Sequence, residues 1–316
     1  MNENFCVVLR SVGERTENAS IKIVKNQVSD KDAFFLIKGK PFGEAHIESI
    51  QIALKSEAKW ALFLDADVLL KDDAIETMLT IAKNAPIQFF QYNFRILDYE
   101  FEGESYGVHF YSTKFFNKAL KYKEIALQSS RPEYQVCYEI AKNERLPSLS
   151  SDAVVALHGY EQYYADLYRT AFVRSVRYRR HLDFFLRSYS DGYLNNETTN
   201  FDKIFMFWGL IFGMIYGYDH YKAPLDKTFY EEQVNKIFTH FGIREKSDLH
   251  LNDDYVNTIF NFYTPSPLYL ANRHWLCPQS GISINVPDNS IKGRFLRFSI
   301  PILVRIKRSI KTLLFG

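Results

Sequence analysis

The sequence predicts an α/β fold, in which a domain with a mainly parallel sheet is followed by a mostly α-helical C-terminal region. Over the first hundred residues, short apolar runs alternate with segments of helical spacing, as in sheets whose strands are joined by helices. After residue 160 the pattern changes to long aromatic and arginine-rich segments with helical spacing. The 316 residues suffice for one large domain, or for a compact domain with a smaller partner.

Each element of the first domain follows from its own pattern. Ile47, Ile50 and Leu54 fall at i, i+3 and i+7, which gives the helix within 40–58 one apolar face. Residues 19–24 fit either a helix or an edge segment. The apolar runs predict buried strands, and helical spacing predicts the connections. The predicted strands are 5–9, 33–39, 60–66, 87–94 and 152–159, and further helices are predicted at 72–85 and 131–144.

The second half predicts helices to about residue 265 and a proline-rich loop at 263–290. The apolar stretch 204–218 is shorter than the about 20 residues that a membrane-spanning helix needs, so we expect a buried helix. Residues 293–316 carry no acidic residue, and a helix starting at Pro301 would be basic on one face and apolar on the other. Such a helix is typical of contact with an anionic membrane, and the alternative is a helix packed on the protein body. The predicted regions are 1–160, 161–290 and 291–316.

Composition excludes several classes of protein. The formal net charge of +2 argues against a nucleic-acid-binding protein. The three cysteines lie far apart, which fits neither a disulfide framework nor a zinc site. The N-terminus has no basic region followed by a long apolar run, so no secretory signal is expected. Together with the basic tail, these features predict a cytoplasmic protein held peripherally at the inner face of the cell membrane.

Two aspartates mark the expected functional site. Asp65 and Asp67 stand at the end of the third predicted strand, and ligands of parallel α/β sheets bind beyond the carboxyl ends of strands. Ala66 points the opposite way in an extended chain, so both carboxylates can face one side. Two carboxylates there suit Mg²⁺ or Mn²⁺ held against a substrate diphosphate. The alternative is a strand-end turn with solvated acids.

The segment "WALFLDADVLL" resembles the DxD segment of the GT-A glycosyltransferases, which have a Rossmann-like fold and use nucleotide-diphosphate sugars. "FCVVLRSVGERTE" resembles their first strand and nucleotide-contacting loop, and "PFGEAHIESIQIALKSEA" resembles the helix before the DxD strand. "RPEYQVCYEIAKNERLPSLSSDAVVALH" has the layout of family-2-like members, in which an acidic residue opens a helix and a strand ending in His follows. The resemblance covers about the first 160 residues.

The resemblance implies a set of donor-site residues. Asp67 would be the main metal ligand, Asp65 would contact the ribose or the metal, and His158 would complete the coordination sphere. For His158 the alternative is a strand-end histidine bonded to its neighbours. The residues expected on the donor side of the first loop are Arg10, Ser11 and Arg15, whose alternative is surface solubility, with Glu14 and Asp32 as further partners for base or ribose.

The resemblance also points to Glu133 as the catalytic base of an inverting transfer. Family members usually have Glu-Asp there, whereas this chain has Glu133 followed by Tyr134. The competing carboxylates lie on a predicted acceptor-side loop, which also carries His109: Asp98, Glu100 and Glu102.

The expected activity is that of a divalent-metal-dependent, inverting glycosyltransferase of the hexosyltransferase type. It would move sugar from a nucleotide-diphosphate donor, a UDP-sugar being favoured, to a saccharide or lipid-linked acceptor in surface polysaccharide or lipopolysaccharide biosynthesis. One alternative is a nucleotidyltransferase, although "RSVGERTE" has a single glycine where a glycine-rich phosphate loop is expected. Another is a non-catalytic glycan- or membrane-binding protein that retains the fold. The helical region fits a sugar- or lipid-binding role, a packing domain or a homo-oligomer interface.

Overall fold

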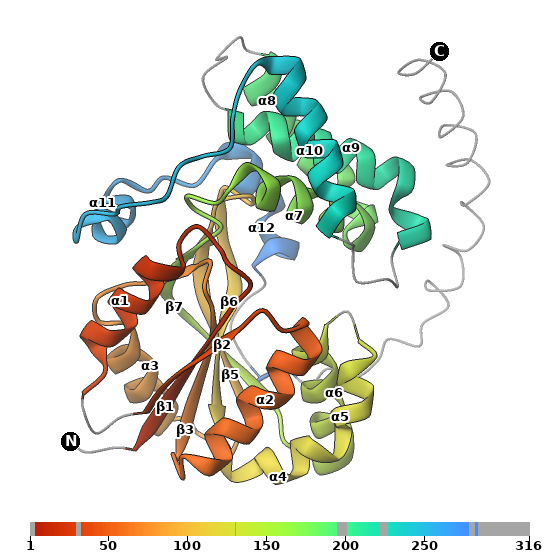
Figure 1. Ribbon diagram of the computed structural model, residues 1–316. Helices are drawn as coiled ribbons and strands as arrows, with labels where there is room; N and C mark the ends of the chain where they lie inside the picture. Colours follow the sequence, from red (N-terminus) through yellow and green to blue (C-terminus); the bar gives the residue numbers. More distant parts are fainter. Residues whose placement is uncertain are drawn as a thin grey trace. The chain divides into compact units, whose positions relative to one another are not determined.

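The computed structural model describes residues 4–29, 33–129, 131–194, 201–220, 227–277 and 282–283. All of them belong to one compact unit, Met1–Ile284. Figure 1 shows a twisted sheet with helices on both faces and a group of helices, α7 to α10, beyond one end of its strands. The predicted fold class is confirmed. Asp32 and the predicted basic tail lie outside the described residues.

The described strands form one sheet in the order β2-β1-β3-β6-β5-β7-β4, with β8 paired to β7. The pairs β1–β2, β1–β3 and β5–β7 are parallel, and the pairs β3–β6, β5–β6, β4–β7 and β7–β8 are antiparallel. The bounds are β1 (Phe5–Ser11), β2 (Ala33–Lys38), β3 (Trp60–Asp65), β4 (Val68–Leu70), β5 (Gln91–Asp98), β6 (Gly103–Ser112), β7 (Ser148–His158) and β8 (Ile282–Ser283).

The helices predicted within 40–58, at 72–85 and at 131–144 are present as α2, α3 and α6. The segment 19–24, left open between helix and edge strand, lies in α1. The α-helical bounds in the first half are α1 (Glu17–Gln27), α2 (Phe42–Lys55), α3 (Ala74–Lys83), α4 (Phe116–Ala119), α5 (Lys123–Leu127) and α6 (Pro132–Glu144). Those in the second half are α7 (Tyr164–Arg177), α8 (Leu182–Leu194), α9 (Phe201–His220), α10 (Lys227–Phe241), α11 (Tyr255–Phe262) and α12 (Pro267–Leu276). Short 3₁₀ helices are η1 (Thr113–Phe115), η2 (Leu120–Tyr122) and η3 (Arg179–His181).

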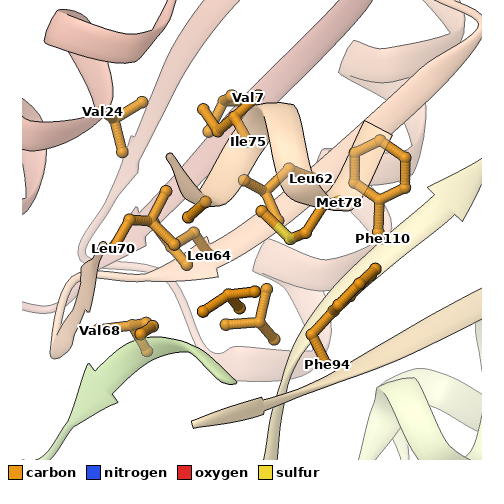
Figure 2. Packing of buried hydrophobic residues seen from close by; sticks show 14 of the residues in the cluster. Val7, Val24, Leu62, Leu64, Val68, Leu70, Ile75, Met78, Phe94 and Phe110 are labelled. Carbon is orange, nitrogen blue, oxygen red and sulfur yellow. The ribbon is translucent and has the colours of Figure 1, made fainter. Parts of the chain in front are cut away.

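The sheet has a hydrophobic core on each face because successive strand residues point to opposite sides. Val7 and Leu62 pack with Met78 of α3 and Val24 of α1 (Figure 2). On the other face, Val8 belongs to a second cluster that the helices α2, α4, α5 and α6 cover. Since both faces are buried, the apolar runs of the central strands are nearly continuous, which is why the sequence shows them so clearly.

The helical region is built on the close packing of α7 against α9. A Cβ atom added at Gly209 would lie 2.2 Å from the carbonyl oxygen of Tyr168, so only glycine allows this approach. A Cβ atom added at Gly213 would be similarly crowded, 2.5 Å from the carbonyl oxygen of Phe172. The stretch 204–218 is therefore a packed helix, as expected. Among the described residues, we find no helix with the length and apolar character needed to cross a membrane.

Two segments predicted as loops are regular structure. The predicted acceptor-side loop is instead the end of β5, a turn at 99–102 and the strand β6, whose alternating buried residues pair with β5. Within the predicted loop 263–290, α12 begins after Ser266, whose side chain accepts a hydrogen bond from the Tyr269 N–H. Ser266 is thus an N-cap with Pro267 at the first helical position, a favoured combination that the proline-rich composition concealed.

Candidate functional site

Asp65 ends β3 and Asp67 lies in the short turn before β4, and backbone hydrogen bonds hold this segment in place. The Ala66 N–H donates to the Arg10 carbonyl at 2.9 Å, and the Thr16 hydroxyl donates to the Ala66 carbonyl at 2.8 Å. The Gly159 N–H donates to the Asp67 carbonyl at 3.2 Å. Ala66 is fully buried in the core, whereas the Asp65 and Asp67 side chains are 39% and 30% exposed. The turn therefore presents both carboxylates beyond the sheet core.

The Asp65 carboxylate forms an ion pair with the guanidinium of Arg10. The buried guanidinium of Arg10 donates to Asp65 Oδ1 at 2.8 Å and to Glu133 Oε1 at 2.7 Å. Burial raises the pKa of Asp65 to about 7, with Glu133 and Asp67 adding to the rise and Arg10 opposing it. The sequence predicts that Arg10 binds a substrate phosphate. In the structure, Arg10 instead pairs with two protein carboxylates, with which such a phosphate would have to compete.

Glu133 lies in the first turn of α6 and is surrounded by positive or polar groups. Besides Arg10, its carboxylate faces His46 Nδ1 at 3.8 Å and His109 Nε2 at 3.5 Å. Burial acts to raise the pKa of Glu133, but Arg10 and the two histidines outweigh it and lower the pKa to about 2. His109 also lies on β6 within 2.8 Å of the Asn93 side-chain oxygen. The structure thus brings Arg10, Asp65, Glu133 and His109 together.

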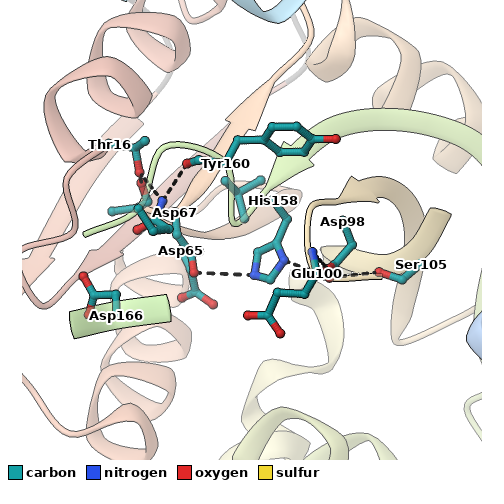
Figure 3. Close-up of polar contacts among 12 residues, drawn as sticks. Thr16, Asp65, Asp67, Asp98, Glu100, Ser105, His158, Tyr160 and Asp166 are labelled. Atoms are coloured by element: carbon teal, nitrogen blue, oxygen red, sulfur yellow. Dashed lines mark hydrogen bonds and ion pairs between the residues drawn. The ribbon is translucent and has the colours of Figure 1, made fainter. Parts of the chain in front are cut away.

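Asp67 belongs to a second group, centred on His158 at the end of β7 (Figure 3). The His158 Nε2 atom lies 3.5 Å from Asp67 Oδ2, and its Nδ1 lies 3.0 Å from Asp98 Oδ2. Burial opposes protonation, yet the two aspartates together raise the pKa of His158 well above its ordinary value. Burial acts to raise the pKa of Asp67, but His158 and other groups outweigh it and lower the pKa, so the carboxyl stays ionised.

Asp67 and His158 fit the divalent cation that the resemblance implies. Asp67 Oδ1 is buried and has no hydrogen-bond partner among the described residues, which is costly for a carboxylate unless something else neutralises it. Carboxylate oxygen and imidazole nitrogen both bind Mn²⁺, and Mg²⁺ sites often use one or two carboxylates with substrate phosphates. In the described part of the chain, no group of three or more His, Cys, Asp or Glu side chains is placed to hold a metal alone. The protein share of a metal site would therefore be two side chains.

The other predicted donor residues are engaged in contacts within the protein. Ser11 donates to Glu14 at 2.7 Å, and the Gly13 N–H donates back to Ser11 Oγ at 3.0 Å, so this serine shapes the first loop. Arg15 donates to Glu161 at 2.7 Å and to the Ser247 carbonyl at 2.8 Å. Arg15 therefore joins the first loop to segments that follow β7.

Asp98, Glu100 and Glu102 are not placed on an exposed acceptor-side loop. Asp98 and Glu100 are each 2% exposed, and all three face inward to the helical region. Their partners there are Arg174 of α7, which contacts both Asp98 and Glu100, and Lys203 of α9, which contacts Glu102. Asp98 is therefore not on the acceptor side, as the sequence predicted, but is buried in contact with His158 Nδ1.

Sequence reasoning missed two residues of α7 that lie near the turn. Burial raises the pKa of Asp166 to about 6, and Glu14 and Asp67 contribute to the rise. Arg169 lies 3.4 Å from Asp166, and its charge also lowers the pKa of Asp67. The spacing of three residues in one helix signals an ion pair, but nothing local indicates that this helix end reaches the Asp67 turn.

Comparisons with known proteins give similarity of structure alone. No family model and no curated protein matches the chain. A glycosyltransferase involved in the glycosylation of the major capsid of PBCV-1 has 13% identity and a TM-score of 0.33, over 49% of this chain and 92% of its own. A mannosyltransferase from Pyrobaculum calidifontis, in complex with GDP-Man and Mn²⁺, has 10% identity and a TM-score of 0.37, over 86% of this chain and 87% of its own. A mannose-1-phosphate geranyltransferase from Thermus thermophilus has 14% identity and a TM-score of 0.29, over 50% of this chain and 74% of its own. At these scores none carries an argument about activity, so function is inferred from the side chains.

Proposed function

We propose that this chain is a metal-dependent glycosyltransferase of the GT-A type, which transfers sugar from a nucleotide-diphosphate donor, a UDP-sugar being favoured. One observation carries most weight. Asp67 lies just beyond the carboxyl end of a parallel strand, and one of its oxygens is buried without a hydrogen-bond partner among the described residues, while His158 Nε2 is 3.5 Å from its other oxygen. In open α/β sheets this end of the strands is where ligands bind. A cation that arrives with the substrate would give this oxygen the partner that it lacks among the described residues.

The chain's residues then take distinct roles. Asp67 and His158 would hold Mn²⁺ or Mg²⁺, which supplies positive charge to the leaving diphosphate. Arg169, with a side chain 44% exposed and close to Asp67, is placed to bind a diphosphate oxygen. Asp65 is held by Arg10, which suits a carboxylate that orients the donor ribose rather than one that binds metal.

The candidate catalytic base is chosen by comparing the pKa values of Glu133 and Asp166. General bases work best with a pKa near the operating pH, and with a pKa of about 2 Glu133 accepts protons poorly at neutral pH. Asp166 is better suited, with a pKa of about 6, a side chain 26% exposed and a position near Asp67. Glu133 is then an anion that fixes Arg10 and His109.

Calorimetric titration with UDP and Mn²⁺ tests the proposal. Wild type is expected to bind, and Asp67→Ala is expected to lose binding. Asp73→Ala is the matched control, because this aspartate lies in the same segment with a side chain 60% exposed. If wild type fails to bind, or Asp67→Ala binds as wild type does, the metal-dependent donor site is rejected.

Incubation with a panel of sugar nucleotides separates the classes of activity. Release of UDP, or of another nucleoside diphosphate, supports glycosyl transfer and excludes a purely binding protein. Release of pyrophosphate in a reaction with a nucleoside triphosphate would indicate nucleotidyl transfer instead. The proposed setting, a membrane-bound step in surface polysaccharide or lipopolysaccharide assembly with a glycan or glycolipid acceptor, rests on the basic sequence of residues 293–316.

A further inference from the structure

Asp98 lies on the side of His158 opposite Asp67. The His158 ring spans the two carboxylates, with Nδ1 3.0 Å from Asp98 and Nε2 3.5 Å from Asp67 (Figure 3). Asp98 is 2% exposed and reaches neither solvent nor an acceptor directly. Its position is that of the carboxylate behind a metal-binding histidine in many metalloproteins.

The orientation of Asp98 is fixed from two sides. Asp98 Oδ1 accepts the backbone N–H groups of Glu100 at 3.0 Å and Phe101 at 3.1 Å. Asp98 Oδ2 faces His158, the Ser105 hydroxyl at 3.5 Å and Arg174 at 3.4 Å. One oxygen is therefore committed to the backbone of the turn, and the other is presented to the imidazole.

The helical region holds this turn from outside the sheet. Arg174 of α7 forms an ion pair with Glu100, and its guanidinium lies 4.2 Å from the centroid of the Phe101 ring. The Tyr189 hydroxyl of α8 donates to Glu100 at 3.1 Å, and Lys203 of α9 pairs with Glu102. The helices α7, α8 and α9 thus contact Glu100, Phe101 and Glu102 in the turn that follows Asp98.

We infer that Asp98 is a positioning residue for His158, and that the helical region acts on the donor site by holding Asp98 through Arg174. The inference rests on the proposed function, in which His158 binds the cation. In the neutral ring that metal binding requires, a carboxylate that accepts the Nδ1 hydrogen leaves the lone pair on Nε2, the atom that faces Asp67. The helices α7, α8 and α9 then help to build the metal site through Arg174, Tyr189 and Lys203.

Asp98→Asn reverses the hydrogen-bond direction with almost no change of volume. Because two backbone N–H groups need an acceptor at the Oδ1 position, the amide oxygen takes that place and the amide nitrogen faces His158. The imidazole must then accept at Nδ1 and carry its hydrogen on Nε2, which removes the ligating lone pair. We expect Mn²⁺ affinity, measured with UDP by calorimetry, to fall about 10- to 100-fold.

A spectroscopic signature separates positioning from general damage. In wild type loaded with Mn²⁺, the electron spin-echo signal should show modulation from a directly bound imidazole nitrogen, which His158→Gln should abolish. Asp98→Asn should lose this modulation while circular dichroism stays that of wild type. Glu102→Gln is the matched control, since this carboxylate lies in the same turn and contacts Lys203 and Ser188 but not His158.

The outcomes distinguish the two hypotheses. If wild type binds Mn²⁺ with nitrogen modulation and Asp98→Asn keeps both, the positioning role is rejected and the proposed function stands. If wild type binds no Mn²⁺ with UDP, both are rejected. Should Asp98→Asn fail to fold, Arg174→Lys replaces it. Lysine keeps the charge but not the two-pronged contact, so weaker Mn²⁺ binding supports the role, and unchanged binding rejects it.

Discussion

Replacing Glu133 by Gln tests whether this carboxylate serves as an ion-pair partner. Its pKa falls from the ordinary 4.5 to about 2, and each pKa unit corresponds to about 1.4 kcal/mol, so the ionised carboxylate stabilises the fold by about 3 kcal/mol at neutral pH. Because folding lowers the pKa of Glu133, its stabilising contribution weakens in acid. The contribution is fully present above pH 4.5 and is lost as the pH falls toward 2. Glu133→Gln should therefore lose about 3 kcal/mol at pH 7 and progressively less below pH 4.5.

Urea denaturation followed by circular dichroism from pH 7 to pH 3 measures this difference. Glu139→Gln is the control on the same helix, because its carboxylate accepts from the side-chain amides of Gln135 and Asn143. A Glu133→Gln variant as stable as wild type at pH 7, or a difference that does not shrink in acid, would refute the ion-pair account. If transfer activity also survives in Glu133→Gln, the base lies elsewhere, as assigned to Asp166.

Three further predictions concern other parts of the chain. Gly209→Ala should lower the melting temperature, because its Cβ would lie 2.2 Å from the Tyr168 carbonyl oxygen and force α7 and α9 apart at a cost of about 1–3 kcal/mol. Ser266→Ala should destabilise the protein by about 1 kcal/mol in chemical denaturation through loss of the α12 N-cap, whereas Ser266→Asp should retain most of that stability. Deleting residues 293–316 should abolish cosedimentation with phosphatidylglycerol vesicles, and unchanged sedimentation would contradict a membrane-binding tail.

Strands such as β1 and β3 were predictable because burial on both faces leaves nearly continuous apolar runs. The β5–β6 hairpin was not, because its turn is rich in acidic residues that resemble a solvated loop. Those acids are buried only because Arg174 and Lys203 arrive from helices far along the chain. The α12 helix was hidden for another reason, since the composition of its surroundings outweighed the local capping signal at Ser266.

The site was predictable in its residue types but not in its pairings. An aspartate pair after an apolar run shows that carboxylates stand at a strand end, and periodicity says nothing about what meets them there. Arg10 and Glu133 are 123 positions apart, and Arg174 and Asp98 are 76 apart. Contacts over such separations depend on the completed sheet and on the packing of α6 and α7, which no local pattern encodes.

Those pairings make the two aspartates of the turn unequal. Arg10 forms ion pairs with both Asp65 and Glu133. Asp67 and Asp98 both contact His158, and one oxygen of Asp67 has no hydrogen-bond partner among the described residues. A buried carboxylate oxygen without a hydrogen-bond donor destabilises the folded protein. Such an oxygen is tolerated where a bound ligand compensates for the missing donor. In the proposed site, Asp67 and His158 would therefore hold the cation, and Asp65 would orient the donor beside them.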